Sequence, residues 1–500
     1  MLLPLIAVIS TVHLEAAVPL DGGDYVDVPF TVPAETVEIR ITHDDGSDFD
    51  ILDWGVWSPE GFRGWGGGNT EDAIIGVDQS SRSYLPGAIT PGTWTVVIGK
   101  AQLGQAGGHY SIDVTFDDAA TLVVRPKAEF TPVTLSPDRR WYKGDFHVHS
   151  SESGDADASF DQIGELAKSR GLDFVNLSDH NTNSQVALVA AVQPTHPDVL
   201  FLRGAEITTY AGHGNAVGLP SYIDHRIGYA GRTIVNVLDE VEAQGALFIV
   251  NHPTLDLGDN CIGCAWGHAD TPWNKVSGLE VITGKWDVVE RLFVPSAIAL
   301  WDEQLAAGNR IAAIGGSDDH RAGTGTGITD TPLGSPTTLV LADNLSEAAI
   351  IEGIRKGRTI VQLRGPDDPF VDVHVEAPDG TLAEIGDDVD GVAEMTMQLH
   401  VTGGAGNFAQ LWRDGEKLEQ IPIDSDDFEH VFVDEPGAQD RRYRVELITD
   451  ANQRIVVTSH VYIHGVEAEG GGCCHSSSGG GLTGVPLVAA FVALLRRRRR

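Results

Sequence analysis

The stretch from residue 144 to 155 reads GDFHVHSSESGD and places two histidines at the end of a short strand-like run. His147 and His149 are two residues apart, so both imidazoles point to the same side of a β-strand. The acidic residues Glu152 and Asp155 follow directly. Such a pair is weak evidence when taken alone. It becomes a candidate metal site if other strands bring further ligands to the same place.

Four more strand-like runs between residues 141 and 364 also finish on side chains that can bind metal. LDFVNLSDHN ends on Asp179, His180 and Asn181, DVLFLRGAE on Glu206, ALFIVNHP on Asn251 and His252, and RIAAIGGSDDH on Asp318, Asp319 and His320. Buried polar groups without partners are costly, so five such strand ends without a shared purpose are not expected.

Helical patterns separate these runs. SFDQIGELAKSRG has an apolar face with Gly171 as its stop, and IVNVLDEVEAQG has Gly245 in the same role. Strands that alternate with helices predict an α/β fold with parallel strands, whose carboxyl ends lie together on one face. We therefore expect the five strand ends to meet at one site.

The ordered set of HxH, SDHN, a glutamate, NHP and GSDDH resembles the PHP (polymerase and histidinol phosphatase) metal-dependent hydrolases. Within them it is most similar to the branch named for the carbaryl and microcin hydrolases. The resemblance covers residues 141–364 and implies a distorted (βα)7 barrel. The ligands that it implies are His147, His149, Asp155, His180, Glu206, His213, His252, Asp318 and His320.

The resemblance implies hydrolysis with two or three divalent ions. Imidazole and carboxylate ligands suit Mn²⁺, Fe²⁺ or Zn²⁺ and do not select among them. A glutamate among histidines can bridge two ions about 3.5–4 Å apart, and such a pair can hold a hydroxide for an in-line displacement. The candidates for catalysis are Asp179, His180 and Asp318, and Asp179 and Asn181 also flank His180 as supporting residues.

Three basic residues lie beside the motifs and are candidates for binding an anionic substrate: Arg203, Lys285 and Arg321. Arg203 could instead neutralise buried acids. The pair Cys261 and Cys264 in CIGC could form a disulfide, bind zinc with His268, or take part in redox exchange. A disulfide that pins a loop over the mouth of the site is favoured, because zinc needs four ligands and the segment offers three.

The flanking regions read as all-β. Residues 20–118 contain short alternating runs, such as GTWTVVIGK and GHYSIDVTF, and resemble the pre-peptidase C-terminal β-sandwich found beside secreted bacterial hydrolases. That resemblance implies an accessory role in binding or solubility. Residues 119–140 are expected to be a linker, and residues 367–466 a second β-sandwich.

Both ends of the chain resemble targeting segments. Residues 1–17 are apolar and end in small residues, as in a signal peptide, although they lack a basic start. Residues 467–500 hold a Gly/Ser spacer, Cys473 and Cys474, a short apolar run and an arginine cluster. Their order resembles a myxobacterial C-terminal sorting tag, with a plain tail anchor as the alternative. Either implies an exported, envelope-anchored protein with a short transmembrane segment.

The formal net charge is −38, and no internal basic cluster offsets it. Such a charge repels nucleic-acid phosphates, so a nuclease is disfavoured and no nucleic-acid partner is expected. The most favoured function is a phosphoesterase acting on a small-molecule ester. A carbamate or amide hydrolase at the same site is the nearest alternative. A surface-binding protein on a degenerate barrel is the non-enzymatic one, and the complete ligand set opposes it.

Overall fold

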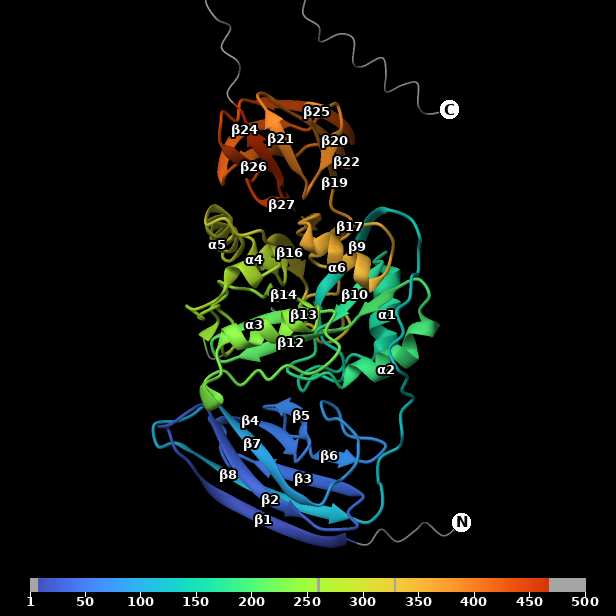
Figure 1. The fold of residues 1–500 in the computed structure, drawn as a ribbon, viewed down its shortest axis with the longest axis vertical. Coiled ribbons are helices and arrows are strands. Elements are labelled where there is room, and N and C mark those ends of the chain that lie inside the picture. The colour runs from blue at the N-terminus through green and yellow to red at the C-terminus, as the bar shows by residue number, and fades with distance from the viewer. Residues whose placement is uncertain (1–7, 259–260, 328–329, 467–500) are drawn as a thin grey trace, which may run out of the picture. The chain divides into compact units, whose positions relative to one another are not determined.

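The computed structural model describes residues 8–258, 261–327 and 330–466. β-Strands build most of it, and the helices of the described residues all lie between residues 160 and 355 (Figure 1). None of those helices is long and apolar enough to cross a membrane. The expected C-terminal tag, residues 467–500, lies outside the described residues.

The first region is a sandwich of two four-stranded antiparallel sheets, with the orders β1-β8-β3-β6 and β2-β7-β4-β5 (Figure 1). Alternate residues of the inner strands, such as Trp94, Val96 and Ile98, fill the core between the sheets. The strands are β1 (Val8–Val18), β2 (Tyr25–Val32), β3 (Glu38–Asp44), β4 (Ile51–Ser58), β5 (Gly61–Gly67), β6 (Ala73–Gly76), β7 (Gly92–Gln102) and β8 (Gly108–Asp117).

The sandwich begins earlier than the sequence predicts. β1 starts at Val8 rather than near residue 20, and it pairs with β8 through Val18. Val12 and Leu14 pack on the core while Glu15 is exposed, so the segment alternates as an edge strand does. The residues expected to be an export signal therefore overlap a paired strand. Export remains a proposal.

The central region contains two mixed sheets and few helices. One has the order β12-β13-β14-β15-β16, and the other begins β11-β10-β9-β17-β18. The strands are β9 (Arg140–Val148), β10 (Phe174–Leu177), β11 (Leu200–Leu202), β12 (Gly204–Thr209), β13 (Gly212–Val217), β14 (Leu247–Val250), β15 (Gly278–Thr283), β16 (Ala312–Gly316), β17 (Thr337–Ala342) and β18 (Thr359–Gln362).

The helices of the central region cover its strands. They are α1 (Phe160–Ser169), α2 (Gln185–Val192), α3 (Ile234–Ala243), α4 (Trp286–Val289), α5 (Val294–Ala306) and α6 (Glu347–Arg355), with short 3₁₀ turns η1 (Gln193–Thr195), η2 (Tyr229–Gly231) and η4 (Trp273–Lys275). α1 begins with a capping box at Ser159, and left-handed glycines follow α1 and α3, as the sequence predicts.

A regular (βα)7 barrel is not confirmed. β12 and β13 form an antiparallel hairpin, because only two residues separate them and a parallel crossover needs a dozen or more. The two sheets meet at two seams, each marked by one isolated bridge. His180 pairs with Glu206 beside β10 and β12, and Val148 pairs with Asp319 beside β9 and β16.

The third region is the expected second sandwich, with one four-stranded sheet in the order β20-β19-β22-β25. Its other sheet continues the central sheet without a break, since β18 pairs with β27. The strands are β19 (Phe370–Glu376), β20 (Leu382–Glu384), β21 (Asp388–Val392), β22 (Met395–Thr402), β23 (Phe408–Arg413), β24 (Glu416–Pro422), β25 (Asp427–Asp434), β26 (Asp440–Ile448), β27 (Arg454–Thr458) and β28 (Val461–Gly465).

A buried ion network ties this sandwich to α5. The guanidinium of Arg444, fully buried, donates to both carboxylate oxygens of Asp302, at 2.5 and 3.0 Å, and to Glu446 at 2.9 Å. Removing one partner of such a network leaves buried charge without compensation, which costs about 3–5 kcal/mol.

We therefore expect Arg444→Met to lower the free energy of unfolding by about 3–5 kcal/mol in urea titrations of the full chain. The matched control is Lys168→Met, which breaks an exposed pair with Asp198 and should cost less than about 1 kcal/mol. Similar small losses in both variants would show that the buried network adds no stability.

Candidate metal centre

The structure brings all nine candidate ligands together, although they come from seven separate segments. The end of β9 supplies two histidines, the loop after it one aspartate, and five further strands or the residues just after them supply the rest. They are His147 on β9 and His149 directly after it, Asp155 in the following loop, His180 after β10, Glu206 on β12, His213 on β13, His252 after β14, and Asp318 and His320 after β16.

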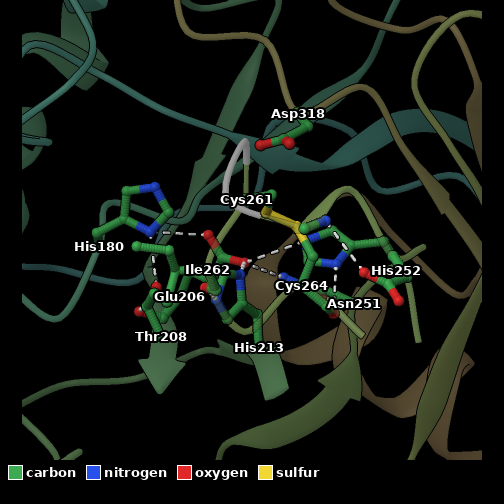
Figure 2. Close-up of a disulfide and its surroundings, with 12 residues drawn as sticks. His180, Glu206, Thr208, His213, Asn251, His252, Cys261, Ile262, Cys264 and Asp318 are labelled. Carbon is green, nitrogen blue, oxygen red and sulfur yellow. Dashed lines mark hydrogen bonds and ion pairs between the residues drawn. A yellow bond between two sulfur atoms is a disulfide. The ribbon is translucent and has the colours of Figure 1, made fainter. Parts of the chain in front are cut away.

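Glu206 lies at the centre of this cluster and is almost fully buried. Figure 2 shows its carboxylate between His180 on one side and His213 and His252 on the other. Five imidazole nitrogens lie within 3.6 Å of its oxygens: Oε2 is 2.9 Å from His180 Nδ1, 3.3 Å from His147 Nε2 and 3.5 Å from His149 Nε2, and Oε1 is 3.5 Å from His213 Nδ1 and 3.6 Å from His252 Nε2.

Two aspartates extend the cluster. Asp318 Oδ1 is 3.2 Å from His147 Nε2 and 3.1 Å from His149 Nε2. Asp155 Oδ2 lies 3.3 Å from Nε2 of both His180 and His320. The side chains thus form several overlapping three-residue sets that could each hold an ion: His149, His180 and His320; His147, Glu206 and His252; and His147, His149 and Asp318.

The donor atoms themselves fit bound cations. Four of them are buried without a hydrogen-bond partner: His147 Nε2, His149 Nε2, His213 Nδ1 and Glu206 Oε2. Native proteins rarely leave buried polar atoms unsatisfied, and an ion at their common centre would satisfy several at once. The set holds imidazole and carboxylate donors, which suit divalent Mn, Fe or Zn without selecting one.

Charges within the cluster shift its pKa values in opposite directions. Burial alone would lower the pKa of His147, but Asp318, Glu206 and Glu280 raise it well above its usual value. Burial alone would raise the pKa of Glu206, but His147 and His180 hold it well below its usual value. Without an ion, the carboxylates are therefore ionised and attract positive charge.

Three residues orient the ligands, and the sequence singled out only one of them, Asn251. Glu280, a lone acid in the apolar strand β15, accepts from His147 Nδ1 at 3.0 Å and from the backbone N of His252 at 2.8 Å. Thr208 Oγ1 lies 2.7 Å from His180 Nδ1, and Asn251 Nδ2 donates to Glu206 Oε1 at 2.9 Å. The acid within an otherwise apolar strand was the available signal for Glu280.

Gly316 permits this packing. A Cβ added there would lie 2.4 Å from His147 Cβ and 2.6 Å from Glu280 Oε1. Any side chain at residue 316 would therefore push His147 away from the position that Glu280 gives it.

Two of the predicted site residues lie elsewhere. Asp179 is fully buried and accepts from the backbone N and Oγ of Ser150, at 2.6 and 2.8 Å, so it braces the loop after β9 rather than facing substrate. Burial raises its pKa to about 7. Arg203 pairs with Glu347 of α6 at 2.6 Å and does not line the site cavity, so its expected role in substrate binding is wrong.

The cluster forms part of the wall of a cavity of about 870 Å³. Lys285 and Arg321, the other two basic candidates, both line it. Arg321 also pairs with Asp157 at 2.9 Å. Apolar side chains also line the cavity, among them Leu255, Ile262, Val288, Val289 and Leu292.

The first sandwich contributes to this cavity, which its resemblance to an accessory domain did not suggest. Tyr25, Asp53 and Trp65 line the cavity. Tyr210 donates its hydroxyl to Asp53 at 2.6 Å, and Ser83 donates to the backbone O of Glu152 at 2.8 Å. The sandwich thus contacts the loops that carry the ligands.

Cys261 and Cys264 form a disulfide, as favoured from the sequence, and both line the cavity (Figure 2).

No protein-family model matches the chain, and no curated protein does either. Among the solved structures that are similar to parts of it are two bacterial proteins. One is a two-domain protein from Bacteroides vulgatus that contains a predicted PHP-like metal-dependent phosphoesterase. It is 17% identical over 68% of this chain and 100% of its own, with a TM-score of 0.37.

The other is described as a candidate metal-dependent phosphoesterase from Bifidobacterium adolescentis. It is 14% identical over 38% of this chain and 91% of its own, with a TM-score of 0.27. With TM-scores this low, neither likeness assigns a function to this chain.

Glu206→Gln should remove at least one bound ion per chain, because the neutral amide no longer balances the ions that the central carboxylate contacts. Elemental analysis of the purified full chain gives the count. Glu165→Gln, on the exposed face of α1, is the control and should keep the full complement. An unchanged metal content in Glu206→Gln would contradict a central role for this residue.

Proposed function

We propose that this chain is a metal-dependent hydrolase that cleaves phosphomonoesters. The observation that carries the proposal is the gathering of eight imidazole and carboxylate side chains around Glu206, with four buried donor atoms in the cluster that lack a hydrogen-bond partner. Their position in the wall of a cavity gives a substrate access to them.

The site would hold two or three divalent ions through the three overlapping sets of ligands. When bound, such ions activate water and stabilise the charge that develops on a phosphoryl group. His147, His149 and Glu206 are buried and would bind the ions on the side away from solvent.

The open side of the cluster faces the substrate. The side chains of His180, His320 and Asp318 are 23%, 22% and 33% exposed, and Asp155 is 57% exposed. His180 and Asp318, both predicted as catalytic, would pass a proton to or from a substrate bound on this side. Lys285 and Arg321 supply positive charge for the phosphoryl oxygens.

The cavity favours one phosphoryl group on an apolar alcohol. Two basic side chains suffice for a single phosphate, whereas a polyphosphate or nucleic acid needs a longer basic groove. The leucine and valine side chains that line the cavity, with Tyr25 and Trp65 of the first sandwich, would bury an aryl or alkyl leaving group.

A carbamate or amide substrate would be cleaved at the same metal ligands, so the test below includes these bonds.

An exported, envelope-anchored location also remains part of the proposal. It is supported by the Cys261–Cys264 disulfide, since disulfides persist mainly in oxidising compartments.

His149→Ala and Asp318→Ala should each lower phosphate release from p-nitrophenyl phosphate at least about a hundredfold, a loss of roughly 3 kcal/mol of transition-state stabilisation. Asp198→Ala, which changes an exposed residue that does not line the cavity, is the control and should retain activity. Turnover of a naphthyl carbamate or a peptide amide alone would replace the phosphoesterase with the carbonyl chemistry. No bound metal and no turnover of any substrate would overturn both.

Trp65→Ala should raise KM for naphthyl phosphate about tenfold and change kcat less than twofold, because the indole would bury the leaving group without touching the reacting bond. Phe49→Ala is the matched control, since Phe49 belongs to the same sandwich but is exposed and does not line the cavity. An unchanged KM in Trp65→Ala would show that the first sandwich takes no part in substrate binding.

A further inference from the structure

The loop closed by the Cys261–Cys264 disulfide contacts two of the candidate ligands through its backbone (Figure 2). His213 Nε2 donates to the carbonyl oxygen of Ile262 at 3.1 Å. His252 Nδ1 donates to the carbonyl oxygen of Cys264 at 3.0 Å. Both ring nitrogens that face the loop must carry the proton, because a carbonyl oxygen only accepts.

The opposite ring nitrogens are thereby left free to bind an ion. His213 Nδ1 and His252 Nε2 lie 3.5 and 3.6 Å from the same oxygen of Glu206, Oε1. In metal sites generally, an acceptor on the outer nitrogen fixes both the tautomer and the ring orientation of a histidine ligand. The two loop carbonyls are such acceptors for the outer ring nitrogens of His213 and His252.

The loop is held tightly in this position. Gly263 has a φ of +77°, and a Cβ there would lie 2.3 Å from the carbonyl oxygen of Thr209, the last residue of β12. Just beyond the disulfide, Trp266 N donates to Pro253 O at 2.8 Å and Gly267 N to Ala211 O at 2.7 Å. The loop is thus packed between the segments that carry His213 and His252.

We propose that the disulfide-closed loop, residues 261–264, is a positioning element that aims His213 and His252 at the ion beside Glu206. The proposal rests on the metal centre proposed above. It also makes the affinity of that ion depend on the thiol–disulfide state. Reduction by a dithiol would break the S–S bond, add two electrons and two protons to give the thiols of Cys261 and Cys264, and leave the dithiol as a disulfide.

Reduction also frees a thiol, which can strengthen ion binding instead of weakening it. Cys264 Sγ and one ring nitrogen of each of His213 and His252 lie within 4.8 Å of one another. A free Cys264 thiolate could therefore become a ligand itself and strengthen binding of a thiophilic ion such as Zn²⁺. Loss of the loop's position would weaken ion binding, whereas ligation by the Cys264 thiolate would strengthen it. Only the second effect depends on Cys264 rather than on either cysteine alike.

The test uses the full chain and follows ion binding rather than turnover. In the double variant Cys261→Ser/Cys264→Ser, the Mn²⁺ affinity of one site should fall about 10–100-fold by titration calorimetry, with the other ions retained. The melting temperature of the metal-free protein reports the fold separately. Mn²⁺ affinities equal to those of the wild-type chain would overturn the proposal.

Gly263→Ala displaces the loop without removing the disulfide, whose presence mass spectrometry can verify. It should weaken the same site by a similar factor. Gly258→Asn is the matched control, because a Cβ at Gly258 meets nothing within 4 Å and asparagine tolerates its φ of +56°. Full Mn²⁺ affinity in Gly263→Ala would also overturn the proposal.

The single variants separate positioning from ligation. Cys261→Ser and Cys264→Ser should weaken Zn²⁺ binding equally if the disulfide acts only by holding the loop. Tighter Zn²⁺ binding in Cys261→Ser than in Cys264→Ser would make Cys264 a ligand and refute the proposal. A wild-type chain that binds no ions would instead overturn the proposed function, so the two failures are distinguishable.

Discussion

The buried carboxylate of Glu206 is the group on which the site depends. It lies at one of the two seams where the central sheets meet, and five imidazole nitrogens from both sheets lie within 3.6 Å of it. Burying a carboxylate costs folding free energy unless opposite charge lies beside it. The closure of the fold and the assembly of the ligands therefore involve the same residues, since His180 and Glu206 also form the bridge between the sheets.

The backbone around the ligands is held in conformations that few residues adopt. Asn181, His252 and Asp318 have φ values of +51°, +27° and +60°, and each lies just beyond the end of a central strand. Such left-handed conformations cost of order 1–3 kcal/mol each and persist only where the surroundings enforce them. Glu280 supplies part of that enforcement at His252, because its carboxylate accepts a hydrogen bond from the backbone N of His252.

Seven of the nine candidate ligands could be located from the sequence because they stand at the ends of apolar runs, whereas Asp155 and His213 were named only through the family resemblance. The sequence also predicted the bounds of α1 and α3, whose capping residues act locally. It did not predict the partner of Arg203, since Glu347 is distant in sequence and the pair forms only when α6 packs. The antiparallel hairpin of β12 and β13 gives one strand the opposite direction to that expected for the barrel. The position of Trp65 beside the site depends on packing between distant regions of the chain, which local sequence patterns do not predict.

The unbroken sheet that joins the central region to the last sandwich has a practical consequence. A chain truncated near residue 366 would lose β27 and leave β18, with the sequence TIVQ, as an open edge. An unpaired apolar edge offers a row of hydrogen-bonding groups to any other strand and favours aggregation. The central region is thus not a separable module, and insolubility of such a fragment would result from the missing neighbouring strand rather than from a defective core.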